Sequence, residues 1–306
     1  MPHGPKNPQQ YPYHNKMIHT AHPVHLSHQH GTVNTYSMLG GLDLKHSELT
    51  TVSGICRESG RFYPALRLIF TLEGQSHLRF GSREIRLQAD SNRSAACLPI
   101  NMPEEGCKIF HNGRQRELVL LCSNVWLENM GCPPHILKAL RQAHLQPHYL
   151  AITPPLSEKI RSLMQTCRRP APWRALHQTM QSMVLAAEVL QTLFPDHSAK
   201  PLSVRLQKLL KLLHDPAAAN ACLNTLAKAC HSNPTTLQQE FQTAFGISIA
   251  HYRREYRLQL ARNALLQNHS VGEAAALAGY GNPECFSKAF KKLFGRPPSR
   301  YRPTGA

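Results

Sequence analysis

The 306-residue sequence has no run of about 18 apolar residues, the length that a membrane-spanning helix needs. Its N-terminus is polar and rich in proline, without the apolar core of a signal peptide. The nine cysteines are odd in number and include no Cys-x-x-Cys pair, which fits a reducing compartment better than a framework of disulfides. We therefore expect a cytoplasmic protein.

Acidic residues are scarce, with 18 Asp+Glu against 35 Lys+Arg and a formal net charge of +17. The excess is densest in the last third, because the chain from Lys200 onward carries 15 Lys+Arg and five Asp+Glu. A charge of this size attracts polyanions such as nucleic acid, and a merely basic surface is the plainer alternative. The length suggests two domains, and a hydrophobic share of 42% supports a folded core.

A basic amphipathic helix is predicted near the C-terminus, from Glu284 to Phe294. Phe286, Phe290 and Phe294 recur every four residues, so they form one apolar stripe that we assign to the core. Gly295 then ends the helix, and the prolines after it prevent its continuation.

A short helix is predicted just before this one, over residues 271–278. The sequence Ser270-Val-Gly-Glu273 is a capping-box pattern that opens it, and Gly279 lies in the following turn. A short helix, a turn and a second helix with an exposed basic face are the pattern of a helix-turn-helix motif.

The same framework occurs 49 residues earlier in the chain. Two copies indicate a pair of DNA-binding heads, because a solenoid needs three or more repeats. We call residues 223–245 the first head and residues 271–294 the second head. A predicted helix from Ala250 to Gln267, ~27 Å long at 1.5 Å per residue, connects them. The matched positions are Asn233-Pro234 with Asn282-Pro283, Phe241 with Phe290, Phe245-Gly246 with Phe294-Gly295, and Tyr252-Arg253 with Tyr301-Arg302.

The exposed side chains of the two recognition helices are the candidates for base contacts. Lys288 suits guanine or a phosphate, Glu284 can accept from a cytosine amino group, and glutamine pairs with adenine. Arginines and further lysines are expected to hold phosphates, which gives affinity but little specificity. For each of them a solvated charge is the alternative. The predicted base-reading residues are Thr235, Gln238, Gln239, Gln242, Glu284, Ser287 and Lys288, and the predicted phosphate contacts are Arg253, Arg254, Arg257, Lys291, Lys292, Arg300 and Arg302.

The fold class that we predict is α+β with several domains. An extended, unpacked arm rich in His and Pro covers 1–32, and a sensor and dimerisation domain covers 33–194. Within the latter, short runs separated by Gly turns predict antiparallel strands, as in a small barrel or a double-sheet jelly roll, followed by helices. A linker at 195–201 leads to an all-α DNA-binding domain over 202–302.

Four histidines of the arm, His22, His25, His28 and His30, offer neutral imidazoles to a divalent metal. Their spacing fits neither an HExxH helix nor a structural zinc module, so a solvated arm without metal is the other interpretation. The predicted helix over residues 173–194 leaves two alternatives open, a core helix and a helix of a homodimer. Its apolar stripe consists of Leu176, Met180, Met183, Val184, Ala187, Leu190 and Phe194.

The C-terminal arrangement resembles the AraC/XylS family of bacterial transcription regulators. The resemblance covers about residues 202–302 and lies in Arg257-Leu-x-x-Ala261-Arg, in Gly279-Tyr280, and in the segment from Phe286 to Arg302. It implies a transcription activator that binds promoter DNA, RNA polymerase and a small effector, with a cupin-like sensor domain in the N-terminal half. Phe70-Thr-Leu-Glu-Gly and Arg79-Phe-Gly-Ser-Arg-Glu-Ile-Arg-Leu are most similar to the pyochelin-regulator branch, which implies iron homeostasis and a ferric siderophore as effector.

The first head departs from the family in two respects. His231 stands in its turn where relatives often have Gly, and a non-glycine residue at positive φ costs ~1 kcal/mol. Its recognition helix also carries glutamines in place of Lys or Arg, so its contacts to DNA would be neutral hydrogen bonds.

We predict a regulator that is not an enzyme and has no cofactor. The two alternative functions are a cupin-type metal enzyme and a thiol-based redox sensor. A cupin-type metal enzyme would need histidine ligands on the strands, and His46, His77 and His111 are available but form no close His-x-His pair. A thiol-based redox sensor would use Cys97, Cys107, Cys122 and Cys132, which we expect to be buried thiols instead. The Pro-Cys-His-Arg core of alkyl-transfer repair proteins in this family is lacking.

Overall fold

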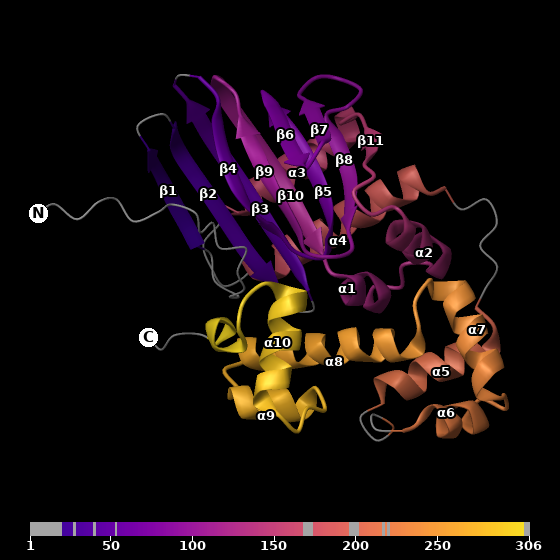
Figure 1. The fold of residues 1–306 in the computed structure, drawn as a ribbon. Coiled ribbons are helices and arrows are strands. Elements are labelled where there is room, and N and C mark those ends of the chain that lie inside the picture. Colours follow the sequence, from indigo (N-terminus) through magenta and orange to yellow (C-terminus); the bar gives the residue numbers. More distant parts are fainter. Residues whose placement is uncertain are drawn as a thin grey trace, which may run out of the picture. The chain divides into compact units, whose positions relative to one another are not determined.

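The computed structural model describes residues 20–26, 29–38, 41–52, 54–167, 174–195, 202–215, 218 and 221–302 (Figure 1). Its contacts divide the chain into two compact units. The β unit comprises Met1–Cys122 and Leu145–Leu193, and the helical unit comprises Ser123–His144 and Phe194–Ala306. Within the described ranges, no helix is long and apolar enough to cross a membrane.

The β unit contains two antiparallel sheets, as the sequence predicts. The larger sheet has the order β1-β2-β3-β10-β5-β8-β11, and the smaller has the order β4-β9-β6-β7. The strands are β1 (Thr20–Leu26), β2 (Gln29–Met38), β3 (Leu42–Thr51), β4 (Cys56–Phe62), β5 (Ala65–Glu73), β6 (Gln75–Phe80), β7 (Arg83–Gln88), β8 (Ala95–Ile100), β9 (Glu104–Phe110), β10 (Gly113–Cys122) and β11 (His148–Leu150).

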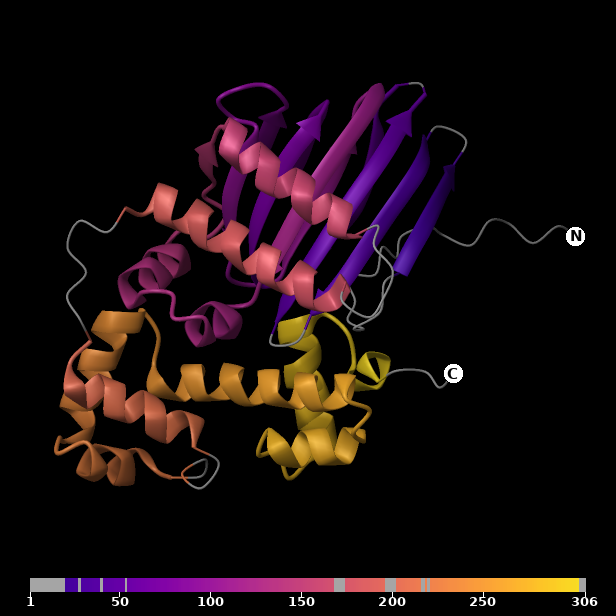
Figure 2. The same cartoon turned by 180° about the vertical axis from the view of Figure 1, so that it is seen from behind.

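The core of the β unit consists of apolar side chains from both sheets. Leu78 and Ile85 come from the smaller sheet, while Ile69, Leu98 and Leu121 come from the larger one. Alternation along β7 buries every second residue, as expected of a strand with one face in a core. Two helices, α3 (Pro154–Cys167) and α4 (Arg174–Leu193), run across the larger sheet (Figure 2).

The predicted arm over residues 1–32 is in part a pair of strands. Residues 20–26 form β1, which pairs with β2 in a register that places Pro23 opposite Thr32. β1 is the edge strand of its sheet, so the missing N–H of Pro23 can face away from the ladder. The proline content, which suggested an unpacked chain, is therefore compatible with an edge strand. Residues 1–19 lie outside the described part of the chain.

The helical unit carries the predicted series of helices. They are α5 (Val204–His214), α6 (Leu223–Ala229), α7 (Pro234–Phe245), α8 (Ile249–Leu266), α9 (Val271–Leu277), α10 (Pro283–Phe294) and the 3₁₀ helix η2 (Pro298–Tyr301). Two further helices, α1 (Asn124–Asn129) and α2 (Pro134–Gln142), group with them by contacts. The predicted sensor domain over 33–194 therefore differs from the observed grouping at residues 123–144. Most of the predicted linker lies outside the described residues.

Candidate nucleic-acid interface

The second head has the local chemistry that its sequence predicts. The Asn282 side chain caps α10 by accepting a hydrogen bond from the backbone N–H of Glu284 at 2.7 Å. Gly295 ends the helix at φ 85°, a left-handed conformation that favours glycine. Phe286 and Phe290 are fully buried, and the partly buried Phe294 packs against the same core, with its ring 4.6 Å from that of Phe290.

The first head is a structural copy of the second. Asn233 accepts a hydrogen bond from the backbone N–H of Thr236 at 2.8 Å, and Gly246 ends α7 at φ 75°. The aromatic packing is repeated as well: the rings of Phe241 and Tyr252 are 5.3 Å apart at 81°, and those of Phe290 and Tyr301 are 5.0 Å apart at 85°. The internal repeat that the sequence indicates is therefore confirmed.

The turn of the first head contains the strained residue that the sequence indicates. His231 has φ 51°, and Gly279 has φ 75° at the equivalent place in the second head. The first turn is shorter by one residue, because Ser232 alone separates His231 from the cap Asn233, whereas Tyr280 and Gly281 separate Gly279 from its cap. An L-residue in this conformation costs roughly 1–2 kcal/mol.

The predicted base-reading side chains lie at matching positions on α7 and α10. Thr235, Gln239 and Gln242 are exposed on α7, and Glu284 and Lys288 are exposed on α10, 49 residues after Thr235 and Gln239. The position that matches Gln242 is Lys291, which is exposed and was predicted to contact phosphate. The remaining pair, Gln238 and Ser287, is partly exposed. The two helices thus present equivalent faces that differ in charge.

Two of the predicted phosphate contacts, Arg253 and Arg257, come from α8 and lie against other parts of the helical unit. Arg253 donates a hydrogen bond to the backbone oxygen of Ala221 at 2.6 Å, next to the start of the first head. Arg257 lies against the turn of the second head, where a Cβ atom on Gly279 would be 2.7 Å from its Nη1. Burial and the nearby Arg253 lower the pKa of Arg257. These two arginines on α8 therefore each reach toward a different head.

The other predicted phosphate contacts lie on the surface of the helical unit. Arg254, Lys291, Lys292 and Arg300 are exposed. Arg302 is exposed too, and its guanidinium donates to Oδ1 of Asn268 at 3.3 Å. These cations are therefore accessible to a partner in solution.

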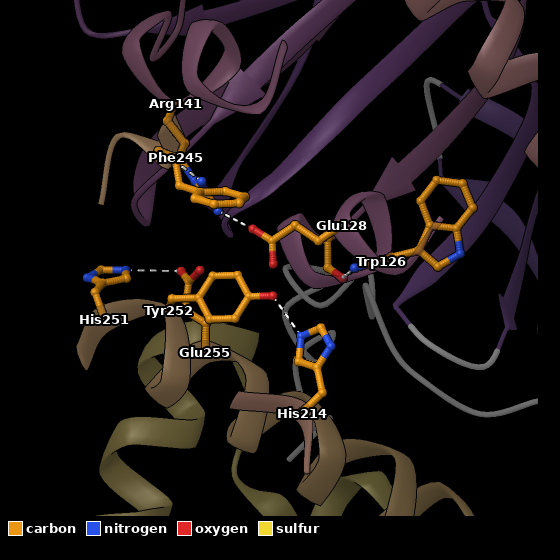
Figure 3. A network of polar contacts seen from close by, with 9 residues as sticks. Trp126, Glu128, Arg141, His214, Phe245, His251, Tyr252 and Glu255 are labelled. Atoms are coloured by element: carbon orange, nitrogen blue, oxygen red, sulfur yellow. Dashed lines mark hydrogen bonds and ion pairs between the residues drawn. The ribbon is translucent and has the colours of Figure 1, made fainter. Parts of the chain in front are cut away.

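A buried polar cluster, which the sequence did not predict, lies beside the first head (Figure 3). Arg141 of α2 pairs with Glu128 of α1, and its Nη1 donates to the backbone oxygen of Phe245 at 2.5 Å. Tyr252 hydrogen-bonds Glu128, and its hydroxyl is 2.7 Å from Nε2 of His214. Burial raises the pKa of Glu128 to about 7, although Arg141 opposes the shift.

The β unit offers a polar pocket with a volume of about 590 Å³. Ser91 and Ser157 contribute hydroxyls to its wall, and Asp90 contributes a carboxylate. Its two arginines are paired with glutamates, Arg116 with Glu48 and Arg161 with Glu158. Thr71 also lines it, within the segment that resembles the pyochelin-regulator branch. The pocket therefore suits a ligand with hydrogen-bonding groups.

The histidines of the proposed metal enzyme are only partly brought together. Nδ1 of His77 is 3.0 Å from Nε2 of His111, whereas His46 is paired with Glu48 at 3.4 Å. Across the described ranges, no three His, Cys, Asp or Glu side chains are placed to hold a metal ion. His28 and the side chains of His22 and His25 lie outside the described residues.

The cysteines of the proposed redox sensor are shielded. Cys97, Cys107 and Cys122 are buried, as expected. Cys132 is partly buried, and burial raises the pKa of its thiol to about 12, which disfavours a reactive thiolate.

Comparisons with known proteins agree with this geometry. Residues 226–304 match a family model described as a helix-turn-helix domain. The transcriptional activator RhaR of Pectobacterium carotovorum is 30% identical over 151 residues, which are 48% of this chain and 52% of that protein. The bifunctional transcriptional activator/DNA repair enzyme AdaA of Bacillus subtilis is 33% identical over 81 residues, 26% of this chain and 38% of that protein.

The matches to these two curated relatives span about half of their length or less. The crystal structure of apo ToxT from Vibrio cholerae covers 87% of this chain and 98% of that chain, with 11% identity and a TM-score of 0.48. The helix-turn-helix domain that the sequence motifs indicated is confirmed by the family model over residues 226–304. Over part of its length, this chain is similar to the transcriptional activators RhaR and AdaA.

Proposed function

We propose that the protein is a sequence-specific DNA-binding transcription regulator that acts as an activator. The observation that carries this proposal is the pair of matching recognition helices, α7 and α10, with equivalent polar faces exposed. Lys288 and Glu284 read bases in the second head, while Gln239 and Gln242 do so in the first. The net charge of +17 supplies attraction to phosphates.

DNA enriched from a randomised duplex pool by the full chain tests the proposal. Binding should weaken by about 10³ to 10⁵ between 50 and 200 mM salt if six to ten phosphates are contacted. Lys288→Ala should lower affinity and change the selected sequence. Lys159→Ala, which removes an exposed lysine of the β unit, is the matched control. No enrichment, or a flat response to salt, contradicts the function.

The effector that we propose is a small molecule bound by the β unit, with a ferric siderophore as the first candidate. The support is the resemblance of residues 70–74 and 79–87 to the pyochelin-regulator branch, together with the polar pocket that includes Thr71. Titration with a panel of ferric siderophores, with metal-free siderophores and sugars as controls, tests this. RNA polymerase is the proposed partner on the promoter.

The homodimer that we propose forms through α4. Leu176, Met180 and Val184 recur every four residues on this helix and are 53%, 56% and 55% exposed. Its opposite face is buried, with Leu185 and Val189 almost inaccessible. A second copy is the simplest occupant, since a stripe on one helix can pair with itself about a two-fold axis. Met180→Glu should convert the dimer to a monomer in light scattering, whereas Gln191→Glu on the same helix should not; a monomeric wild-type chain contradicts the proposal.

A further inference from the structure

The last carbonyl groups of a helix have no partner within the helix and need one from elsewhere. In the second head, the backbone oxygen of Phe294 at the end of α10 accepts a hydrogen bond from the Tyr301 hydroxyl at 2.7 Å. Tyr301 comes from η2, directly after the recognition helix, and its ring packs on Phe290. The second head thus completes the C-terminus of its own recognition helix.

The first head has the equivalent tyrosine but uses it differently. Tyr252 stands 49 residues before Tyr301 and packs its ring on Phe241 in nearly the same geometry. Its hydroxyl, however, meets Glu128 and His214 (Figure 3). This tyrosine hydroxyl is therefore engaged elsewhere.

Arg141 takes the place of that hydroxyl at the end of α7. Its Nη1 donates to the backbone oxygen of Phe245, the residue equivalent to Phe294, and its Nη2 pairs with Glu128. The side chains of Arg141 and Glu128 are only 7% and 6% exposed. A planar guanidinium can donate to both acceptors at once, which a lysine ammonium cannot do with the same geometry.

Arg141 belongs to residues 123–144, which connect β10 to β11. Ser123 follows the last residue of β10 directly and caps α1 by accepting a hydrogen bond from Trp126 N at 3.1 Å. At the other end, Leu145 donates to the backbone oxygen of Pro99 at 2.9 Å and accepts from Arg83 at 2.8 Å, both in the β unit. The segment is therefore tied to strands immediately beyond both of its ends.

We propose that Arg141 is a positioning residue of the first recognition helix, and that residues 123–144 couple strands β10 and β11 to the C-terminal end of that helix. This inference rests on the proposed DNA-binding function. The second recognition helix has its own cap in Tyr301, so a change in the β unit that displaces this segment removes the cap of one recognition helix and leaves the cap of the other intact. The two heads of the repeat thus differ in regulation as well as in charge.

The test uses the full chain and the duplex that the wild type enriches from a randomised pool. Footprints of Gln239→Ala and Lys288→Ala first assign each half of the site to a head. Arg141→Met keeps the apolar stem and removes both donors. Protection of the half bound by the first head should then weaken about tenfold, the effect of losing a charged hydrogen bond, while the other half stays within twofold. Tyr301→Phe is the matched control and should weaken the other half.

Two further measurements separate positioning from a general loss of fold. Hydrogen exchange in the last turn of α7 should accelerate in Arg141→Met and stay unchanged in α10. Glu128→Gln, which leaves an acceptor for Arg141, should keep the first footprint. Equal weakening of both halves, or an unchanged first half, overturns the inference. A wild-type chain that enriches no duplex instead overturns the proposed function itself.

Discussion

The guanidinium of Arg257 lies over the turn of the second head at Gly279. A Cβ atom on this glycine would be 2.7 Å from Nη1 of Arg257, closer than real Cβ contacts, and the backbone there has φ 75°. The backbone conformation therefore favours glycine here, whereas the contact involves the end of a flexible side chain that can move aside. Because Arg257 belongs to α8, this contact also fixes the second head against the connecting helix.

Gly279→Ala should destabilise the helical unit by about 1–2 kcal/mol from the backbone conformation, with little added cost because the end of the Arg257 side chain can move aside. Urea unfolding measures the loss, and DNA affinity should fall with it. Gly272→Ala is the control within the same head, because its Cβ would meet nothing nearer than Ser270 Oγ at 3.9 Å. That change, inside α9, should stabilise by about 0.5–1 kcal/mol. Equal effects at both glycines would contradict this account.

His231→Gly should stabilise the first head, because φ 51° is strained for histidine and open to glycine. Relief of the backbone strain should stabilise the fold by about 1–2 kcal/mol. The greater conformational freedom of glycine in the unfolded chain should cost less than this, so we expect a net gain in stability of up to about 1 kcal/mol. Thermal or urea unfolding measures it. Ser232→Gly, one residue later and not at positive φ, serves as the control and should destabilise.

The charge difference between the heads predicts opposite changes in the dependence of DNA affinity on salt. Gln239→Lys places on α7 the cation that Lys288 provides on α10, so the slope of log affinity against log salt should steepen by about one unit. Lys288→Gln should flatten the slope by the same amount. The double swap should restore the wild-type slope while changing the selected sequence. Unchanged slopes would show that neither side chain lies close enough to the DNA phosphates to affect the salt dependence of binding.

The parts of the fold that were predicted from the sequence depend on local chemistry. Asn233 and Asn282 precede prolines and cap helices, and Gly246 and Gly295 end them, so each boundary is determined within a few residues. The strained turn at His231 was also predictable, because it too depends on residues close to it in the sequence.

The parts that were missed depend on partners distant in sequence. β1 forms because it pairs with β2, although its proline and histidines favour an unpacked chain. Arg141 bonds a carbonyl oxygen 104 residues away, so nothing near it in the sequence indicates that role. The assignment of residues 123–144 to the sensor domain followed chain order, whereas the contacts group them with the helices.

The buried carboxyl of Glu128 predicts a pH dependence of stability. Burial raises its folded-state pKa from the ordinary 4.5 to about 7, so the folded protein binds more protons than the unfolded chain between these values. Stability should therefore fall as pH rises through this window, by of the order of 3 kcal/mol for a shift of this size. Below pH 4.5 the carboxyl is protonated in both states, and its contribution stays constant.

Other charged and polar groups surround Glu128, so the measurement must be a difference between two proteins. Tyr252, Glu255, His214 and Arg141 face the cluster from α8, α5 and α2, and burial lowers the pKa of His214. Glu128→Gln keeps the shape of the side chain and removes its titration. The unfolding free energy of the wild type minus that of this variant should decrease from pH 5 to pH 7.5. Parallel curves for the two proteins would show that Glu128 stays ionised beside Arg141 throughout this range.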